Sequence, residues 1–457
     1  MQHLFFAAVI GLFLSVSVSQ AQPEVLWSRV VPSSAEAEVC NDIIALGDEG
    51  YIVAGNSRRT AHHTRILTLL VGGDGSVTRR DTFGLADHRF CNAALRRANG
   101  ELALAGAFTL NQANPHRNGF VMIADNSDSL VMADYGSTGV DQFYSIVQDT
   151  AGILVMAGST TSYGAGLTDF WMVGAAPPET MYFNRTYGGE EEDECREVLR
   201  TADMGYLLAG MTRSYGPGSR NMFAIRTNAI GDSIWSQVIG SGGSQECNAA
   251  VMTEDGGFAL AGHTNYEFWL VRLDASGNLL WSRIYDGYKC EDIILTHDGG
   301  FLLVGDIWSG GDAEWDGRVV RTDERGNELW SLTIDQEMDD HFYAASQTPG
   351  GGYIIGGSTN AVSAPDRVWL VRLNAEAPFI TVSCAEAETP VVRGIAPVPG
   401  SYTIYSTRNP NHQAGDPHHP DWQWETTMPN VTPGMFEWSD PGSLEEHKYY
   451  IVTHTTL

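Results

Sequence analysis

The chain has 457 residues and a formal net charge of −29, from 27 basic and 56 acidic side chains. Lysine occurs only at Lys289 and Lys448. This balance excludes a nucleic-acid-binding protein or docking on an anionic membrane, because both need clustered basic side chains. Hydrophobic residues make up 43% of the chain, which also contains 50 glycines. This composition is typical of a folded chain and excludes a disordered one.

The N-terminal residues have the pattern of an export signal. Residues 4–18 are apolar, and the small residues Ser19 and Ala21 follow them. The run is short for a membrane-spanning helix, so cleavage after Ala21 is favoured over an uncleaved anchor. We therefore predict a signal peptide over residues 1–21 and a secreted, periplasmic or cell-surface protein. The mature chain would not insert into a membrane.

A short motif of aliphatic residues between glycines recurs along the chain. Its copies end at Gly55, Gly106, Gly158, Gly210, Gly262, Gly305 and Gly357. Successive copies are 51 or 52 residues apart, except for 43 residues between the fifth and sixth. Self-similarity at such a period indicates a repeat architecture.

Each unit contains four short segments with strand character. In unit five they are residues 247–253, 257–262, 268–274 and 278–285, and a tight turn joins Asp274 to Asn278. Four strands in each of seven units predict an all-β, seven-bladed β-propeller over residues 22–376.

The two ends of the repeat region complement each other. Unit seven has only three strand-like segments, whereas residues 25–30 match the fourth strand of unit five. We expect this N-terminal strand to complete the last blade and close the ring, which would remove a free sheet edge.

Two stretches carry a family resemblance. Unit three reads GSTTSYGAGLTDFWMV over residues 158–173, and unit five reads FWLVRLDASGNLLWSRIY over residues 268–285. These segments resemble the repeats of secreted bacterial β-propeller proteins, which implies the fold over residues 22–376. The DxxGxxLW segment is also distantly similar to quinoprotein dehydrogenase repeats, although many of those enzymes have a vicinal cysteine pair that this chain lacks.

Five of the six cysteines occupy one repeat position, at the start of the first strand. They are Cys40, Cys91, Cys195, Cys247 and Cys290. Phe143 and Phe342 take this position in units three and seven. Since a metal site would not alternate thiolate with phenyl, we interpret the position as buried packing rather than as a thiol ring for a soft metal. Disulfides between neighbouring cysteines depend on geometry and stay open.

Acidic residues precede this position in most units, and they are the first candidate ligand-binding residues. The set comprises Glu38, Asp141, Glu194, Glu246 and Asp340, with His341 beside the last. A converging acidic rim could hold Ca²⁺ or attract a cationic partner. Alternatively, each carboxylate caps backbone N–H groups of a turn. This alternative is favoured because Arg89 and Lys289 occupy the equivalent position in two units and interrupt the acidic ring. We predict no cofactor, and Ca²⁺ is the ion that such a rim would suit.

Aromatic residues in the same class of loop are the second candidate set. They are Tyr163, Tyr215, Trp308 and Trp315. Such rings could stack on sugar rings or pack against the sheet edges, and packing is slightly favoured.

The composition changes after residue 376. The last 81 residues contain 10 of the 18 prolines and only 5 of the 50 glycines. Strand-like runs at residues 379–383, 401–406, 422–427, 435–438 and 449–453 predict a small β-sandwich of immunoglobulin or fibronectin type over residues 377–457. Its loop 411–421 contains Asp416 and His418, which are candidate metal ligands or parts of a polar, proline-stiffened loop.

The sequence contains no nucleophile elbow, HExxH motif or phosphate-binding glycine loop. It therefore favours a secreted, non-catalytic binding or surface-associated module that recognises a glycan, peptide or protein at its loop face. The alternative is an enzyme, either a polysaccharide lyase or hydrolase or a quinone-dependent dehydrogenase. We expect a monomer.

Overall fold

The computed structural model describes residues 22–375, except 48–49, 61–62, 85–87, 110–115, 125–129, 179, 311–314, 337–338 and 361–364, together with six strands after residue 378. The predicted signal peptide, residues 1–21, lies outside the described residues. The described part is all-β and contains no α-helix. Accordingly, no helix in that part could cross a membrane.

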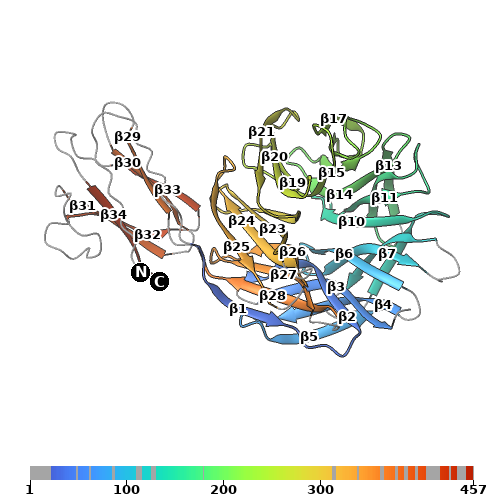
Figure 1. Ribbon diagram of the computed structural model, residues 1–457, viewed down its shortest axis with the longest axis horizontal. Helices are drawn as coiled ribbons and strands as arrows, with labels where there is room; N and C mark the ends of the chain where they lie inside the picture. Colours follow the sequence, from blue (N-terminus) through green and yellow to red (C-terminus); the bar gives the residue numbers. More distant parts are fainter. Residues whose placement is uncertain are drawn as a thin grey trace. The chain divides into compact units, whose positions relative to one another are not determined.

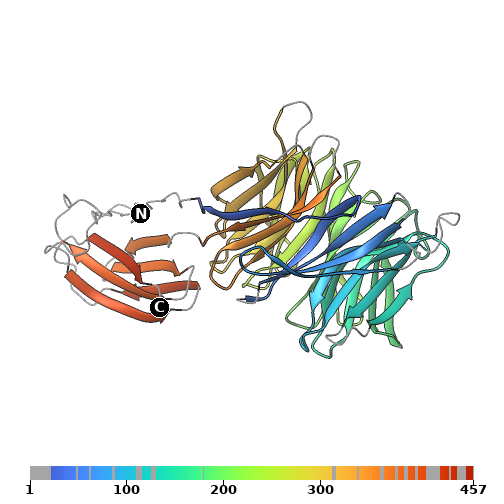
Figure 2. The same ribbon diagram turned by 90° about the horizontal axis from the view of Figure 1, so that it is seen from below.

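The chain divides into two compact units. The larger contains Val25–Gln347 and Tyr353–Arg372, and the smaller contains Met1–Glu24, Thr348–Gly352 and Leu373–Leu457. The larger unit carries the glycine-bounded repeats, and its sheets are seen from two directions in Figures 1 and 2.

Five antiparallel sheets of the larger unit have four strands each, paired in chain order. The first contains β2 (Ala37–Ala45), β3 (Tyr51–Thr60), β4 (His63–Val71) and β5 (Val77–Phe83). The second contains β6 (His88–Arg96), β7 (Leu102–Thr109), β8 (Asn118–Ala124) and β9 (Leu130–Tyr135). The third contains β10 (Asp141–Gln148), β11 (Leu154–Thr160), β12 (Asp169–Ala176) and β13 (Thr180–Tyr187). The fourth contains β14 (Asp193–Arg200), β15 (Tyr206–Thr212), β16 (Asn221–Thr227) and β17 (Ser233–Ile239). The fifth contains β18 (Gln245–Met252), β19 (Phe258–Thr264), β20 (Glu267–Leu273) and β21 (Leu279–Tyr285).

An eight-stranded sheet holds the remaining strands of this unit. One half contains β22 (Lys289–Leu295), β23 (Phe301–Trp308), β24 (Trp315–Thr322) and β25 (Glu328–Ile334). The other contains β26 (Asp339–Gln347), β27 (Tyr353–Asn360), β28 (Arg367–Leu373) and β1 (Val25–Val30). A single parallel pairing, Trp315 with Asp339, joins the two halves. The N-terminal strand β1 thus pairs with β28, the third strand of the seventh repeat.

Successive sheets are connected through their first strands. β2, β6, β10, β14, β18, β22 and β26 contact one another in this order, and β26 contacts β2. A backbone hydrogen bond also links the start of a third strand to the next sheet. For example, the N–H of Asp141 donates to Arg117 O at 2.7 Å, and that of Asp193 donates to Thr168 O at 2.8 Å. We call this link, including the Trp315–Asp339 pairing, the inter-sheet bridge.

The first strand of every repeat bulges at the cysteine position. Register shifts fall between Cys40 and Asp42 and at the equivalent residues of the other six repeats. The five described cysteines are buried and free, and each Sγ contacts the carbonyl two residues further on, as Cys195 does with Glu197 O at 3.3 Å. Burial raises the pKa of these thiols well above the ordinary value. They pack as small buried groups.

Where phenylalanine replaces cysteine, the neighbouring sheet supplies the space. Phe143 stacks on Trp171, with ring centroids 4.5 Å apart. A Cβ added to Gly119 on β8 would lie 2.7 Å from the Phe143 ring, closer than side chains pack. Phe342 has the same relation to Trp369 and Gly317. In the other junctions this position holds an aliphatic or aromatic residue in the same buried cluster as the cysteine, as Phe170 and Cys195 show. The pairs are therefore complementary in size.

This complementarity predicts a rescue between two destabilising changes. Gly119→Phe overfills the junction and should lower the free energy of unfolding by about 1–3 kcal/mol. Phe143→Cys leaves a cavity and should lower it by about 3 kcal/mol. The double variant reproduces the Phe170–Cys195 pair, so urea denaturation should show a loss well below the sum of the two. Strictly additive losses would contradict the complementarity.

The smaller unit contains two three-stranded antiparallel sheets. One pairs β29 (Phe379–Cys384), β30 (Pro390–Ala396) and β33 (Gly434–Ser439), and the other pairs β32 (Gln423–Val431), β31 (Gly400–Thr407) and β34 (Tyr449–Thr455). The five strand-like runs predicted after residue 376 are confirmed as strands, and β30 is an addition. Asp416 and His418 lie outside the described residues.

Candidate functional site

Glu38, Asp141 and Asp340 lie two residues before the cysteine position and are buried. Asp141 accepts the N–H of Ser137 at 2.9 Å, and Asp340 accepts that of Gln336 at 2.5 Å. Each therefore caps the turn that enters its strand. Glu38 accepts the Ser57 hydroxyl at 2.9 Å and pairs with Arg80 at 2.6 Å. Asp193, which sequence analysis left out of the set, caps the equivalent turn through the N–H of Gly189.

Glu194, Glu246 and His341 lie one residue later, so their side chains point to the opposite face of the strand. Each has a partner. Glu194 pairs with Arg196 at 2.7 Å, Glu246 with Arg220, and His341 Nδ1 with Asp306 at 3.2 Å.

Partial burial raises the pKa of Glu246, but Arg220 and His263 outweigh it and leave a net lowering. Burial lowers the pKa of His341, but the hydrogen bond with Asp306 outweighs it and leaves a net rise. The six predicted residues thus belong to two sets with different surroundings.

Tyr163 and Tyr215 each tie the loop after their second strand to the connection that enters the same sheet. Their hydroxyls donate to the carbonyls of Gly136 and Gly188, at 2.9 and 2.8 Å. The Tyr163 ring also lies 6.2 Å from that of Trp171. These contacts match the packing interpretation of the two tyrosines.

Trp308 and Trp315 belong to a larger group of rings. They form a cross-strand pair between β23 and β24, with centroids 4.8 Å apart and planes at 74°. Tyr288 lies 4.4 Å from Trp315 at 66°, and Tyr266 stacks on Tyr288 at 5.0 Å. The side chains of Tyr266 and Trp308 are 65% and 47% exposed. We call these four residues the aromatic patch.

Tyr266 is held outward by its turn. Thr264 pairs with Glu267, so Asn265 and Tyr266 form a two-residue hairpin with φ of 49° and 69°. Positive φ values at both positions define a turn that favours asparagine and glycine, and tyrosine is an unusual occupant. Sequence analysis missed Tyr266 and Tyr288. The available signal was the shorter spacing of 43 residues between Gly262 and Gly305, which shortens this connection.

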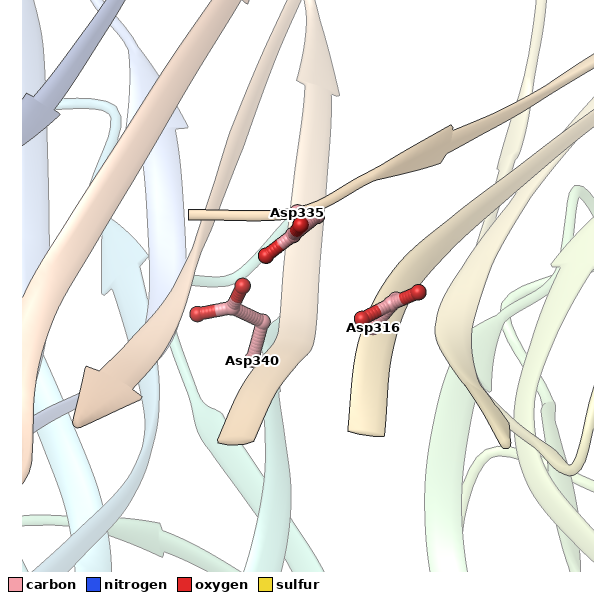
Figure 3. Close-up of side chains that lie close together, drawn as sticks. All are labelled: Asp316, Asp335 and Asp340. Atoms are coloured by element: carbon pink, nitrogen blue, oxygen red, sulfur yellow. The ribbon is translucent and has the colours of Figure 1, made fainter. Parts of the chain in front are cut away.

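Three carboxyl groups come together one residue beyond the Trp315–Asp339 pairing, on the strand face opposite to the Trp315 ring. Asp316 follows Trp315, Asp335 follows β25, and Asp340 is on β26, and one oxygen of each lies within 4.8 Å of the others. Figure 3 shows the three side chains. Because the Trp315–Asp339 bridge aligns β24 with β26, it brings Asp316 and Asp340 together. Oxygen ligands at this spacing could hold Ca²⁺.

A second group of acids, which sequence analysis missed, follows the bulge of the first strands. It contains Asp42, Glu197 and Asp292, each two residues after a cysteine. Asp42 accepts the N–H of Ala94 at 2.7 Å, and Asp292 accepts that of Ala345 at 2.8 Å. Both carboxylates therefore connect their own sheet to the next.

Glu197 makes a similar connection in the opposite direction, since it accepts the Ser145 hydroxyl at 2.6 Å. Burial raises the pKa of Glu197 to about 8, and the charges of Asp292 and Asp42 add to the rise. Burial likewise raises the pKa of Asp292 to about 7 and that of Asp42 to about 6. The three groups therefore have pKa values closer to neutral pH than an ordinary carboxyl group.

No protein-family model and no curated protein matches this chain. Similar solved structures include a protein of unknown function from Dyadobacter fermentans, with 10% identity, a TM-score of 0.39, and coverage of 62% of this chain and 93% of that one. Sqt1 from Chaetomium thermophilum has 10% identity and a TM-score of 0.45, and the match covers 82% and 97%. A luciferin-regenerating enzyme has 8% identity and a TM-score of 0.35, over 60% and 89%. Similarity at this level carries no argument about function.

The raised pKa of Glu197 predicts how stability depends on pH. A carboxyl group that binds its proton more tightly in the folded state stabilises the fold fully below its ordinary pKa, and this contribution is lost as the pH rises through about 8. Glu197→Gln should therefore make the free energy of unfolding fall less steeply between pH 5 and pH 8.5. At the upper end it should exceed that of the unmodified chain by on the order of 1 kcal/mol.

The measurement is urea denaturation across this pH range, with Glu254→Gln as control because Glu254 is exposed in a turn. An unchanged slope in the Glu197 variant would contradict the assignment.

Proposed function

We propose that the larger unit is a seven-bladed β-propeller over residues 22–376, closed by β1 as the fourth strand of the last blade. The support is the seven glycine-bounded repeats, the cyclic contacts of the seven first strands, and the pairing of β1 with β28. We also propose cleavage after Ala21, export, and an immunoglobulin-like or fibronectin-like sandwich over residues 377–457.

We propose that this secreted propeller is a non-catalytic binding module that takes a glycan, peptide or protein ligand on its loop face, with the aromatic patch as the contact surface. The observation that carries the proposal is the exposure of Tyr266 at a left-handed position. An exposed aromatic side chain on left-handed backbone does not stabilise the fold, because the backbone conformation costs free energy and the ring is not buried. Such local strain is often retained at binding sites.

The geometry supports a surface rather than a reaction centre. The patch rings lie on the β19–β20 turn, the start of β22 and the β23–β24 pair, which face the same end of their sheets as the caps of the first strands. Large, rigid aromatic side chains supply contact area at low entropic cost, which suits recognition. The enzymatic alternatives, polysaccharide cleavage and quinone-dependent oxidation, remain predictions from the sequence alone.

This proposal predicts that ligand affinity depends on the patch. The mature chain would be screened against glycan and peptide arrays, and the best ligand titrated by calorimetry. Tyr266→Ala and Trp308→Ala should each weaken binding about tenfold, as expected when a central interface aromatic is removed.

Tyr182→Ala is the matched control, since Tyr182 is 56% exposed on the outer strand β13, away from the patch. It should leave affinity within about twofold. Equal losses of affinity in all three variants, or no loss in any of them, would contradict the proposal.

A further inference from the structure

We propose that the group recognised at the aromatic patch is a cationic side chain of a peptide or protein partner, with arginine preferred. This inference rests on the proposed binding function and specifies its ligand class. It follows from three features of the patch. These are its ring geometry, the acidic side chains on its strands, and the ion pairs and hydrogen bonds that already occupy the neighbouring basic side chains.

The ring geometry suits a cation. Trp315 makes steep angles with both Trp308 and Tyr288, at 74° and 66°. Rings at such angles form the walls of a corner, and a cation placed against an aromatic face is attracted by the ring quadrupole. Tyr266, which stacks on Tyr288, extends the wall outward into solvent.

The acidic side chains lie on the same strands as the rings. Asp316 and Asp339 are next to, and paired with, Trp315, while Asp306 lies two residues before Trp308. Asp316, Asp335 and Asp340, the three acids in Figure 3, cluster one residue beyond Trp315 and Asp339, so they add negative charge near the rings but do not face them. The buried Oδ1 atoms of Asp306 and Asp339 accept no hydrogen bond from the described residues. The strands of the patch therefore carry negative charge beside the rings.

The basic side chains of these strands are already engaged. On β22, β23, β24 and β26 they are Lys289, Arg318, Arg321 and His341. Lys289 pairs with Glu291 at 2.5 Å, Arg321 with Asp298, and His341 with Asp306. Arg318 donates to Asp286 O at 3.1 Å and to two hydroxyls. Their charges are thus matched locally, so they do not cancel the charge of Asp339 beside Trp315.

Charge complementarity selects the occupant. A neutral sugar could stack on the rings but carries no positive charge to match the carboxylates, and an acidic sugar would be repelled. A guanidinium stacks on aromatic faces and presents five donors to acceptor oxygens. The protein already uses this arrangement internally, because Arg196 lies over the Tyr144 ring at 4.3 Å and pairs with Glu194 at 2.7 Å. An arginine of a partner would repeat it.

The experiment titrates the mature chain by calorimetry, in EDTA, with two probes. One is a glycine-spaced peptide with four arginines, and the other replaces each arginine with citrulline, which keeps the shape and removes the charge. The arginine peptide should bind at least tenfold more tightly. Raising NaCl from 20 to 300 mM should weaken it, and millimolar Ca²⁺ should also weaken it by competing for the carboxylates.

Variants separate the patch from the general acidity of the chain. Trp308→Ala and Asp339→Asn should each reduce affinity for the arginine peptide at least fivefold. Glu254→Gln removes the same charge from an exposed turn at the other end of β18, and Tyr182→Ala removes an exposed ring elsewhere. Both controls should stay within about twofold. Equal weakening by Asp339→Asn and Glu254→Gln would overturn the inference, since binding would then be diffuse.

Two other outcomes distinguish this inference from the function on which it rests. Binding of a neutral glycan that depends on Trp308, without preference for arginine over citrulline, would overturn the cationic ligand and leave the binding module intact. If no peptide or glycan binds in a Trp308-dependent way, both fail. A requirement for Ca²⁺ in peptide binding would also overturn the inference of a cationic ligand, because the carboxylates would then bind the ion rather than the partner.

Discussion

The inter-sheet bridge is the constraint on which the rest of the larger unit depends. A four-stranded sheet in this chain buries both faces only when it packs on its neighbours, and the bridge fixes how neighbours align. At five of the seven junctions it joins the start of a third strand to the next first strand, as at Arg117 and Asp141 or Trp315 and Asp339. Residues far apart in the sequence therefore acquire fixed partners, and both the core and the candidate site are built from these pairs.

The alignment that the inter-sheet bridge sets pairs polar residues one position beyond the bridge and packing residues two positions beyond it. One residue beyond the bridge, Asp316 and Asp340 come together beside a third acid, whereas the equivalent pair in the fourth junction is Asn221 and Gln245. Two residues beyond it, Gly317 leaves room for the Phe342 ring. Each junction is thus a variation on one geometry, and the junction that carries Trp315 combines an acidic pair with exposed rings.

The sequence predicted much of the fold because its signal is local and repeated. Glycine-bounded strands, the hairpin at Asp274, the match of residues 25–30 to a fourth strand and the packing role of the cysteines all follow from short patterns. The candidate site was less predictable. The sequence does not distinguish adjacent positions on opposite faces of a strand, so Asp141 and Glu194 were grouped although they face different surroundings. Glu197 and Asp292 became visible only once the bulge was located.

The most direct test of this account is hydrogen–deuterium exchange of the mature chain with and without the arginine peptide. Binding at the aromatic patch should slow exchange at residues 264–267, 306–308, 315–316 and 339–341, and leave the turns at the opposite end of the sheets unchanged. Protection confined to those opposite turns or to the smaller unit, at a peptide concentration that saturates binding, would contradict the central claim that the patch is the binding surface.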